Sequence, residues 1–492
     1  MATANQTQVH PDQRPNILFI CVDQWRADCL GFTGHPVVET PHLDRLAHEG
    51  VNFTQAYTAT PSCIPARAAL LTGLSQRHHG FVGYNDRIDW RYAVTMPGLL
   101  AQAGYHTQCV GKMHVHPART LMGFHNVVLH DGYLHRDRAK RDDYTGMDDY
   151  LPWLRDQVGN AAADYIDSGL GCNGYAARAW PYDEMLHPST WVTSQSIDFL
   201  RRRDPTKPFF LMMSYHRPHP PLDPPAYYLN RYMSKTLPDL PKGDWAPDKL
   251  PVRGLDSPVP SNRDEIDLAR RAYYAQISHI DQQLNRMFMA LHAAGVLDNT
   301  AILFTADHGE MLYDHNLVAK ALPFAGSARL PFLLRLPKQN AWSATQTTVN
   351  EVVELRDLLP TFCELAGASV PEIVDGRSIL PLCRGEKAGW RAYLHGEHTS
   401  GREGGANQWL TDGKEKYIWF TQTGQELLFD LTTDPTELHN LAPSAPERVT
   451  LWRQRLMEEL QGREEGFVQD GELVVGRPQQ ATLSNPGCYG AR

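Results

Sequence analysis

The stretch TATPSCIPARAALLTG, from Thr58 to Gly73, organises the predictions for the rest of the chain. Its first half contains turn-forming residues and its second half good helix formers, so Cys63 is expected at or beside the first turn of a helix. A helix start has unpaired backbone N–H groups and a partial positive charge, which favour an anion and lower the pKa of a thiol. Arg67 follows four residues later, on the same helix face. The sequence therefore gathers a cysteine, a fixed cation and free N–H groups in one place.

An isolated cysteine at a helix start is usually only a small buried hydrophobic residue. Here the order Cys-x-Pro-x-Arg is followed by AALLTG, which ends at Gly73. The combination closely resembles the signature of type I sulfatases, which belong to the alkaline phosphatase superfamily. In that family the cysteine is oxidised after translation to Cα-formylglycine, whose hydrated aldehyde is the nucleophile. The resemblance implies that Cys63 is converted by a formylglycine-generating maturation enzyme.

The composition is that of a soluble globular protein, with 42% hydrophobic and 21% charged residues among 492. The net charge of -9 gives no basic excess that would suggest nucleic acid, so we expect a small-molecule substrate. The polar amino terminus and the lack of a long apolar run predict a cytoplasmic protein without a membrane segment. Eight scattered cysteines without C-x-x-C pairs argue against a zinc cluster or a disulfide framework.

Two apolar runs predict buried strands that end in possible metal ligands. ILFICV, residues 17–22, precedes Asp23 and Gln24, and AILFTA, residues 301–306, precedes Asp307 and His308. Active sites of parallel sheets lie beyond the carboxyl ends of the strands. Two aspartates that converge there would supply the oxygen ligands that a divalent cation needs.

The sulfatase resemblance implies one divalent metal ion held by Asp23, Gln24, the formylglycine oxygen at Cys63, Asp307 and His308. The usual family pairs are Asp-Asp and Asp-Asn. The Asp-Gln and Asp-His pairs of this chain resemble bacterial phosphonate monoester hydrolases, relatives that also use formylglycine. Calcium follows from the resemblance, whereas an imidazole ligand favours manganese, and magnesium stays open.

Further site residues are implied by resemblance to other sulfatase motifs. In GKMH, Lys112 would bind the sulfate oxygens and His114 would act on the substrate or nucleophile. His219, in PHPP, would stand beside the leaving group, Lys320 would clamp the ester's leaving side, and Arg67 would hold the nucleophile. The GKMH segment is also similar to choline sulfatases, so an alkyl sulfate is an alternative to an aryl sulfate.

The expected fold is α/β, with a large mixed, mostly parallel sheet sandwiched by helices and a smaller C-terminal antiparallel sheet plus helix. We predict a catalytic domain over residues 15–373, a smaller α+β subdomain over 374–465 and a tail over 466–492. The stretch DLTTDPTELHNLA, residues 430–442, resembles a carboxyl-terminal sulfatase motif. Residues 117–188 show no clean periodicity and are expected to form insertions and loops. The tail lies either on the surface or across a neighbouring subunit.

Helices are expected over residues 41–50, 189–203, 264–294, 352–366 and 446–462. The sequence leaves homo-oligomerisation open.

Together these motifs predict a sulfatase that hydrolyses a sulfate ester with formylglycine and a metal. A phosphonate monoester or phosphodiester hydrolase using the same groups is the main alternative, favoured by Gln24 and His308. A binding protein that keeps the fold, with Cys63 never oxidised, is a third possibility.

Overall fold

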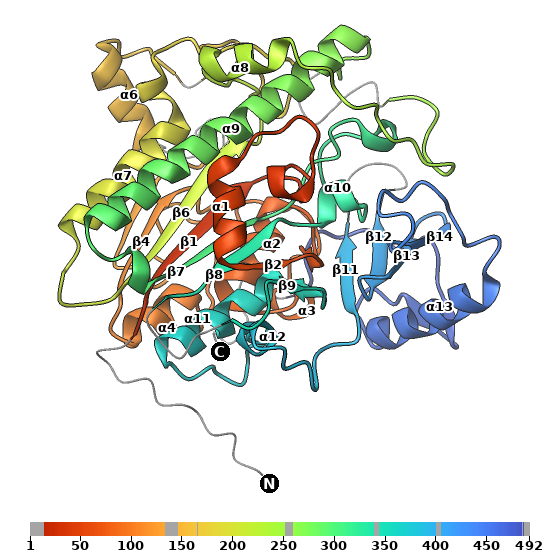
Figure 1. Cartoon of the computed structure of the whole chain (residues 1–492). Helices are drawn as coiled ribbons and strands as arrows, with labels where there is room; N and C mark the ends of the chain where they lie inside the picture. Colours follow the sequence, from red (N-terminus) through yellow and green to blue (C-terminus); the bar gives the residue numbers. More distant parts are fainter. Residues whose placement is uncertain are drawn as a thin grey trace.

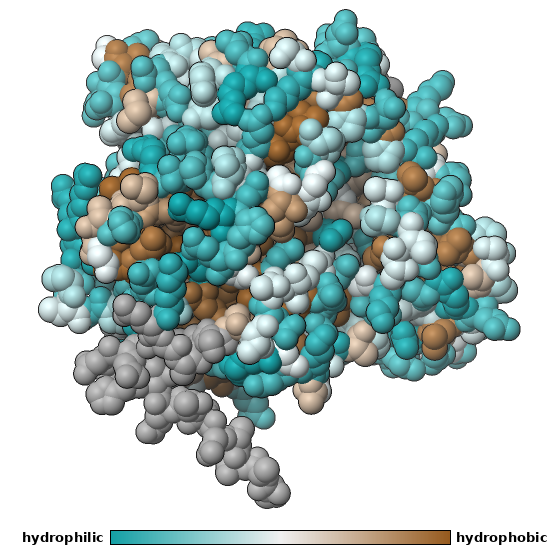
Figure 2. Space-filling model, in the orientation of Figure 1, coloured by the Kyte–Doolittle hydropathy of each residue, from teal (hydrophilic) through white to brown (hydrophobic). Residues whose placement is uncertain are grey.

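A computed structural model describes residues 14–132, 146–164, 166–250, 259–338, 344–399, 405–484 and 486. Some sequence predictions fall on residues outside these ranges. They concern the amino-terminal segment, part of the 117–188 stretch and the end of the tail. Among the described residues, no helix combines the length and the apolar character required to cross a bilayer. On the face drawn in Figure 2, hydrophilic residues predominate and hydrophobic ones are interspersed among them.

The centre of the molecule is an eight-stranded sheet with the order β5-β4-β6-β1-β7-β8-β2-β9 (Figure 1). Its strands are β1 Asn16–Asp23, β2 Val51–Phe53, β4 His106–Gly111, β5 Asn126–Leu129, β6 Phe209–Pro218, β7 Thr300–Ala306, β8 Phe332–Arg335 and β9 Thr348–Val349. The apolar run of β1 is buried along its whole length because parallel partners, β6 and β7, flank it and helices cover both faces. Only β8 runs antiparallel to its neighbours β7 and β2. The mixed, mostly parallel sheet predicted from the sequence is confirmed.

Helices cover both faces of this sheet (Figure 1). On one face α1 and α7 pack against the long α9, which also contacts β6; their bounds are α1 Pro41–Glu49, α7 Pro188–Arg202 and α9 Arg263–Ala293. On the other face α2, α4 and α11 pack together; their bounds are α2 Cys63–Thr72, α4 Met96–Gln102 and α11 Leu358–Ala366. Shorter or peripheral helices are α3 Gln76–His79, α6 Tyr150–Val158, α8 Ala226–Met233, α10 Ala325–Ala328 and α12 Leu380–Cys383.

A second sheet follows the main one in the chain and lies beside it (Figure 1). It is antiparallel in the order β11-β12-β13-β14, with bounds β11 Leu394–His398, β12 Asn407–Thr411, β13 Glu415–Phe420 and β14 Glu426–Asp430. Helix α13, Pro446–Leu460, packs on β12 and β13 through a separate hydrophobic cluster that includes Trp419 and Trp452. This arrangement is the predicted C-terminal sheet plus helix.

The described part of the tail returns to the main domain of its own chain. It forms a short hairpin of β15, Val468–Gln469, and β16, Glu472–Leu473. Beyond the hairpin, the Ala481 carbonyl accepts the Val82 N–H, and the Leu483 N–H donates to the Gly80 carbonyl. These described residues thus contact the main domain of this chain.

The helix expected over residues 352–366 begins later than the sequence suggested. Strand β10, Val353–Glu354, pairs with β3, Ala56–Tyr57, and a 3-10 turn precedes α11. The Asp357 carboxylate accepts hydrogen bonds from the Glu354 and Arg377 N–H groups and pairs with the Arg391 guanidinium. This buried carboxylate caps the turn and keeps the preceding residues extended, which the local sequence pattern did not reveal.

Candidate functional site

Several of the predicted site residues lie at the carboxyl ends of adjacent strands. Strands β4, β6, β1 and β7 are consecutive in the sheet and parallel, so their ends lie along one edge. Asp23 is the last residue of β1, Asp307 follows β7, and Lys112 follows β4. The register therefore brings together side chains that are far apart in the sequence.

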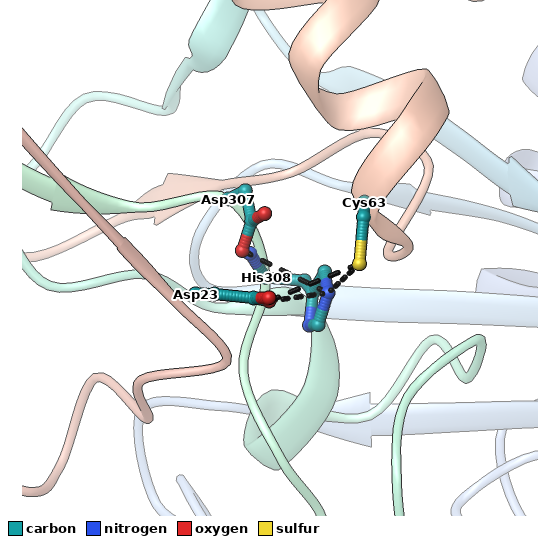
Figure 3. Close-up of side chains that lie close together, drawn as sticks. All are labelled: Asp23, Cys63, Asp307 and His308. Atoms are coloured by element: carbon teal, nitrogen blue, oxygen red, sulfur yellow. Dashed lines mark hydrogen bonds and ion pairs between the residues drawn. The ribbon is translucent and has the colours of Figure 1, made fainter. Parts of the chain in front are cut away.

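Cys63 is the first residue of α2, as the sequence predicted, and its thiol points at the strand ends (Figure 3). Its Sγ lies 3.2 Å from His308 Nε2, 3.8 Å from Asp23 Oδ1 and 3.7 Å from Lys112 Nζ. Cys63, Asp23, Asp307 and His308 are all buried, and their potential ligand atoms lie within 4.8 Å of one another. The four residues thus form one compact group that could hold a cation.

The ring of His308 is held in the tautomer that suits metal binding. Its Nδ1 lies 3.0 Å from the Gly309 carbonyl, which can only accept, so Nδ1 carries the proton. Burial opposes a charge on this ring, but Asp307 and Cys63 outweigh it and raise its pKa above the ordinary value. In the neutral ring that a metal ion requires, Nε2 directs a lone pair into the group, 3.3 Å from Asp23 Oδ1 and 3.7 Å from Asp307 Oδ1. Two carboxylates, an imidazole nitrogen and the atom on residue 63 make a donor set that fits a divalent cation.

Arg67 links the helix to the strand ends. Its Nε donates to Asp307 Oδ2 over 2.9 Å, and its Nη1 donates to the Lys112 carbonyl and to Ser214 Oγ. Both Arg67 and Asp307 are fully buried. The guanidinium fixes the Asp307 carboxylate and the start of α2 relative to each other, so its position one helical turn after Cys63 has a direct structural consequence.

Charges within the group shift the titration of its members. Burial favours a neutral Asp23, but Lys112, Lys320 and His308 outweigh it and hold the pKa of this carboxyl well below its ordinary value. Burial and Asp23 work to raise the pKa of the Cys63 thiol, yet Lys112, Lys320 and His308 keep it below its usual range. The site is thus arranged to hold anions at residues 23 and 63.

Gln24 and Lys320 meet directly beside this group. Lys320 Nζ donates to Gln24 Oε1 over 2.7 Å, and Gln24 N–H donates to Asp307 Oδ1. The amide nitrogen of Gln24 donates to Glu310, a buried carboxylate that sequence reasoning did not assign to the site. The orientation of the Gln24 amide is therefore set from both ends.

Glu310 is held by four other contacts. Tyr175 OH donates to both carboxylate oxygens at 3.0 Å, and the backbone N–H groups of Leu312 and Ala319 donate to Oε1. The position of Glu310 two residues after His308, in the sequence DHGE, was the available signal. Its function could not be inferred there because two of its partners, Gln24 and Tyr175, come from distant segments.

His219 lies just beyond β6, next to Asp23, and its predicted place beside the leaving group stays a prediction. Its Nδ1 donates to the Pro220 carbonyl over 2.8 Å, and burial together with Lys320 holds the pKa of the ring well below its ordinary value. Nε2 of the neutral ring is consequently an acceptor. A buried imidazole in this state can orient a substrate oxygen or take up a proton.

His216 and His219 also lie close to Asp23 as a second trio of potential ligands. Arg217 Nη1 lies 2.8 Å from His216 Nδ1, and a guanidinium only donates. The lone pair of Nδ1 is therefore used, and the proton of the neutral ring resides on Nε2. Because His216 offers no lone pair and Lys112 already pairs with Asp23, this trio does not suit a second cation.

His114 follows Lys112 by two residues and is buried. Its backbone N–H donates to Asp131 Oδ1, and its ring packs edge-on to Tyr84 at 6.0 Å. The catalytic role implied by the GKMH motif stays a prediction.

Comparisons with known proteins agree in one family. A family model described as Sulfatase matches residues 15–368, and one described as N-sulphoglucosamine sulphohydrolase, C-terminal, matches residues 313–465. An arylsulfatase of Clostridium perfringens (strain 13 / Type A) is 47% identical over 475 residues, covering 94% of this chain and 98% of the relative. A multifunctional alkaline phosphatase superfamily protein of Trinickia caryophylli is 30% identical, with 87% and 91% coverage. The crystal structure of a phosphonate monoester hydrolase of Agrobacterium radiobacter aligns with a TM-score of 0.74 at 26% identity, covering 90% of this chain and 95% of that one.

Proposed function

The chain belongs to the sulfatase family and is a sulfuric ester hydrolase, and from this premise we propose that it cleaves an aryl sulfate ester with formylglycine 63 as its nucleophile. The arylsulfatase relative, which matches nearly the whole chain, supports the aryl substrate. The observation that carries the proposal is the position of Cys63. Its Sγ is at the positive end of α2 and within 4 Å of Asp23, Lys112 and His308.

The residues that would hold the divalent ion are Asp23, Gln24, Asp307, His308 and the oxygen on residue 63. The buried carboxylates and the tautomer of His308 support this set. When bound, such an ion supplies a Lewis acid that lowers the pKa of a hydroxyl and stabilises negative charge on oxygen. Calcium is proposed from the family, with manganese favoured by the imidazole and magnesium as a further candidate.

Formylglycine would supply a hydrated aldehyde with two hydroxyl groups. The oxygen of one hydroxyl would displace the alcohol from sulfur. Loss of the proton from the other would let the aldehyde re-form as sulfate departs. Making it requires oxidation of the Cys63 thiol by the maturation enzyme with an external oxidant.

The surrounding residues are suited to the charges that this reaction develops. Lys112 Nζ, 3.7 Å from the atom on residue 63, would bind the sulfate oxygens, and Lys320 would stabilise charge on the leaving side. Arg67 keeps Asp307 and the start of α2 in place. His219 would interact with the departing oxygen, and His114 would act near Lys112.

The test is a substrate comparison on protein co-produced with a maturation enzyme. Mass analysis of the peptide that carries residue 63 should show the aldehyde, and 4-nitrophenyl sulfate should be hydrolysed much faster than a phenyl phosphonate monoester. The Cys63→Ala variant should lose the activity. A persistent thiol without hydrolysis of either ester would refute the proposed nucleophile.

Phosphonate monoester hydrolysis is the second candidate. It is favoured by Gln24 and His308 at the metal positions and by the similarity to the Agrobacterium radiobacter hydrolase. A dominant rate on the phosphonate in the same comparison would establish this candidate in place of the first. Choline sulfate, assayed by sulfate release, covers the alkyl alternative, since a choline-sulfatase of Rhizobium meliloti is 28% identical to this chain.

A further inference from the structure

The loop that carries Lys320 has an unfavourable backbone. Both neighbours of Lys320 adopt positive φ angles, 66° at Ala319 and 73° at Ala321, in the left-handed region that alanine rarely occupies. A backbone of this kind persists only where the surrounding structure holds it. The position of the Lys320 ammonium therefore depends on the contacts made by its loop.

The main domain supplies one set of these contacts. Ala319 N–H donates to Glu310 Oε1 over 2.6 Å, and Ala321 N–H donates to the Pro61 carbonyl over 2.8 Å. Pro61 lies two residues before Cys63, so this hydrogen bond ties the lysine loop to the nucleophile turn.

The C-terminal sheet supplies a second set. Lys416, on β13, donates to the Pro323 carbonyl over 2.9 Å and pairs with Glu437 at 2.6 Å. The other oxygen of Glu437 accepts the Ala325 N–H at 2.7 Å. The two charged side chains are at most 1% exposed, and together they bind the loop on the carboxyl side of Lys320.

The surroundings of the pair fix it in place. The Lys416 ammonium lies 5.6 Å from the ring centroids of both Tyr57 and Trp409. Glu437 belongs to the DLTTDPTELHNLA stretch, residues 430–442, and its carbonyl accepts the indole N–H of Trp245 over 2.6 Å. The stretch singled out in the sequence thus places a buried carboxylate against the lysine loop.

Stability alone gives little reason for such a pair. Desolvation of two buried charges offsets most of their attraction, and apolar side chains of similar volume often stabilise a protein as well or better. A charged pair, however, has hydrogen-bonding groups for a carbonyl and an N–H group, which apolar side chains lack. The contacts to Pro323 and Ala325 use these groups.

We propose that Lys416 and Glu437 are a positioning pair through which the C-terminal sheet holds Lys320 against Gln24 at the catalytic site. The pair makes no contact with the reacting atoms in this role. It restrains the loop so that Lys320 Nζ stays 2.7 Å from Gln24 Oε1. The inference rests on the proposed function for the part that Lys320 takes in turnover.

The test combines the double variant Lys416→Met/Glu437→Leu with Lys320→Ala in a mutant cycle. In the wild-type background the double variant should lower kcat for 4-nitrophenyl sulfate roughly tenfold or more, with a small change in thermal midpoint. In the Lys320→Ala background it should lower kcat less than about twofold, because the lysine it positions is gone. If the double variant lowered kcat by the same factor in both backgrounds, the role of the pair would be merely structural and the proposal would be overturned.

Hydrogen exchange provides a readout that needs no substrate. The backbone amides of residues 317–325 should exchange faster in the double variant than in the wild type. Unchanged exchange rates for these amides would also refute the proposal. If wild-type protein hydrolyses no sulfate ester, the proposed function fails, while the exchange result still decides whether the pair restrains the loop.

Two further variants complete the design. Arg453→Met removes the charge pair with Glu426 on the same subdomain and should change neither kcat nor exchange at 317–325. Glu437→Gln keeps an acceptor for Ala325 and a nearly unchanged volume, so it serves in the same cycle if the double variant does not fold. Glu437→Gln should lower kcat less than the double variant does, and this decrease should likewise be absent in the Lys320→Ala background.

Discussion

Gln24 shows how much of the site depends on the orientation of a single side chain. Its backbone has a positive φ of 66°, and its carbonyl accepts the Tyr273 hydroxyl over 2.7 Å. Its side-chain oxygen faces Lys320 because its nitrogen is bound by Glu310. A reversed amide would present a donor to a lysine, which is also a donor. Glu310 therefore sets the orientation of the Gln24 amide, on which the proposed ligand role of its oxygen depends.

The substitution Glu310→Gln should impair the site without removing any proposed ligand. Its new amide group would face the nitrogen of Gln24, and the Gln24 amide would rotate away from that donor. We expect a loss of roughly 10- to 100-fold in metal affinity or kcat, the range typical of groups that orient metal ligands. Titration with Mn²⁺ and steady-state kinetics measure the two effects.

A reversed pair provides the control for that substitution. Gln24→Glu combined with Glu310→Gln again places a donor against an acceptor and should recover part of the affinity. Tyr175→Phe removes one donor from Glu310 but leaves its carboxylate, so its effect should be much smaller. Wild-type affinity and turnover in Glu310→Gln would contradict the assigned role.

The secondary-structure elements bring the site together through their ends. Gly111, the last residue of β4, has φ 98°, and a Cβ there would lie 1.9 Å from the Ser214 carbonyl of β6. The close approach of the two strands lets Lys112 N–H donate to that same carbonyl. Lys112 then extends over the strand edge to Asp23. The glycine is needed for the geometry of the strand end rather than for the reaction.

Helix α1 begins against a carboxylate of α9. Asp281 accepts the Leu43 N–H at 2.8 Å and the His42 N–H at 3.2 Å, at the first turn of α1. Burial raises the pKa of Asp281 to about 7, against the lowering effect of these two donors. The folded protein therefore retains this proton at pH values where the unfolded chain has lost it.

This shift gives a signed prediction for pH. Between about pH 4 and pH 7 the unfolded chain binds fewer protons at Asp281 than the folded protein, so the free energy of unfolding falls as pH rises. Asp281→Asn removes this contribution. Thermal midpoints of wild type and variant are measured from pH 5 to pH 8. As the pH rises, the midpoint of the wild type should fall relative to that of the variant. A constant difference across this range would show that the group is not protonated in the folded protein.

The whole molecule joins two sheets around one site. The C-terminal sheet contacts the nucleophile turn as well as the lysine loop, since Glu397 N–H donates to the Ala59 carbonyl and His398 Nε2 lies 2.9 Å from Ser62 Oγ. Residue 63 is thus supported by the main sheet on one side and by the second sheet on the other. Binding at the site should consequently stabilise the folded chain as a whole.

Divalent ions should therefore raise the thermal midpoint, and a chelator should lower it. An ion that binds only the folded state adds about 2.7 kcal/mol to the free energy of unfolding at a hundred times its Kd. The shift with Ca²⁺ or Mn²⁺ should be strongly reduced in Asp307→Asn and unchanged in Glu372→Gln, an exposed acid. Differential scanning fluorimetry of unmodified protein is sufficient, because the readout is stability rather than turnover. Equal shifts in both variants would exclude this site as the cause.

The sequence supported the family, the mixed sheet, and the position of Cys63 at a helix start because these depend on local patterns. Apolar runs and turn residues are readable within short segments, and the strand-end location of Asp23 and Asp307 follows from them. The order of the motifs along the chain supported the family. The late start of α11 was missed because two of the groups that hold the Asp357 carboxylate, Arg377 and Arg391, lie 20 and 34 positions away, although its contact with the Glu354 N–H is local.

What the sequence alone determined is therefore the set of reactive groups and the fold that carries them. Tertiary structure decided which atoms meet: His308 Nε2 faces a thiol 245 residues away, Glu310 orients Gln24, and Lys416 reaches a loop 93 residues before it. These relations depend on strand register and on packing between distant segments. No pattern of neighbouring residues encodes them, because each contact is fixed only when the sheets and their connecting loops are in place.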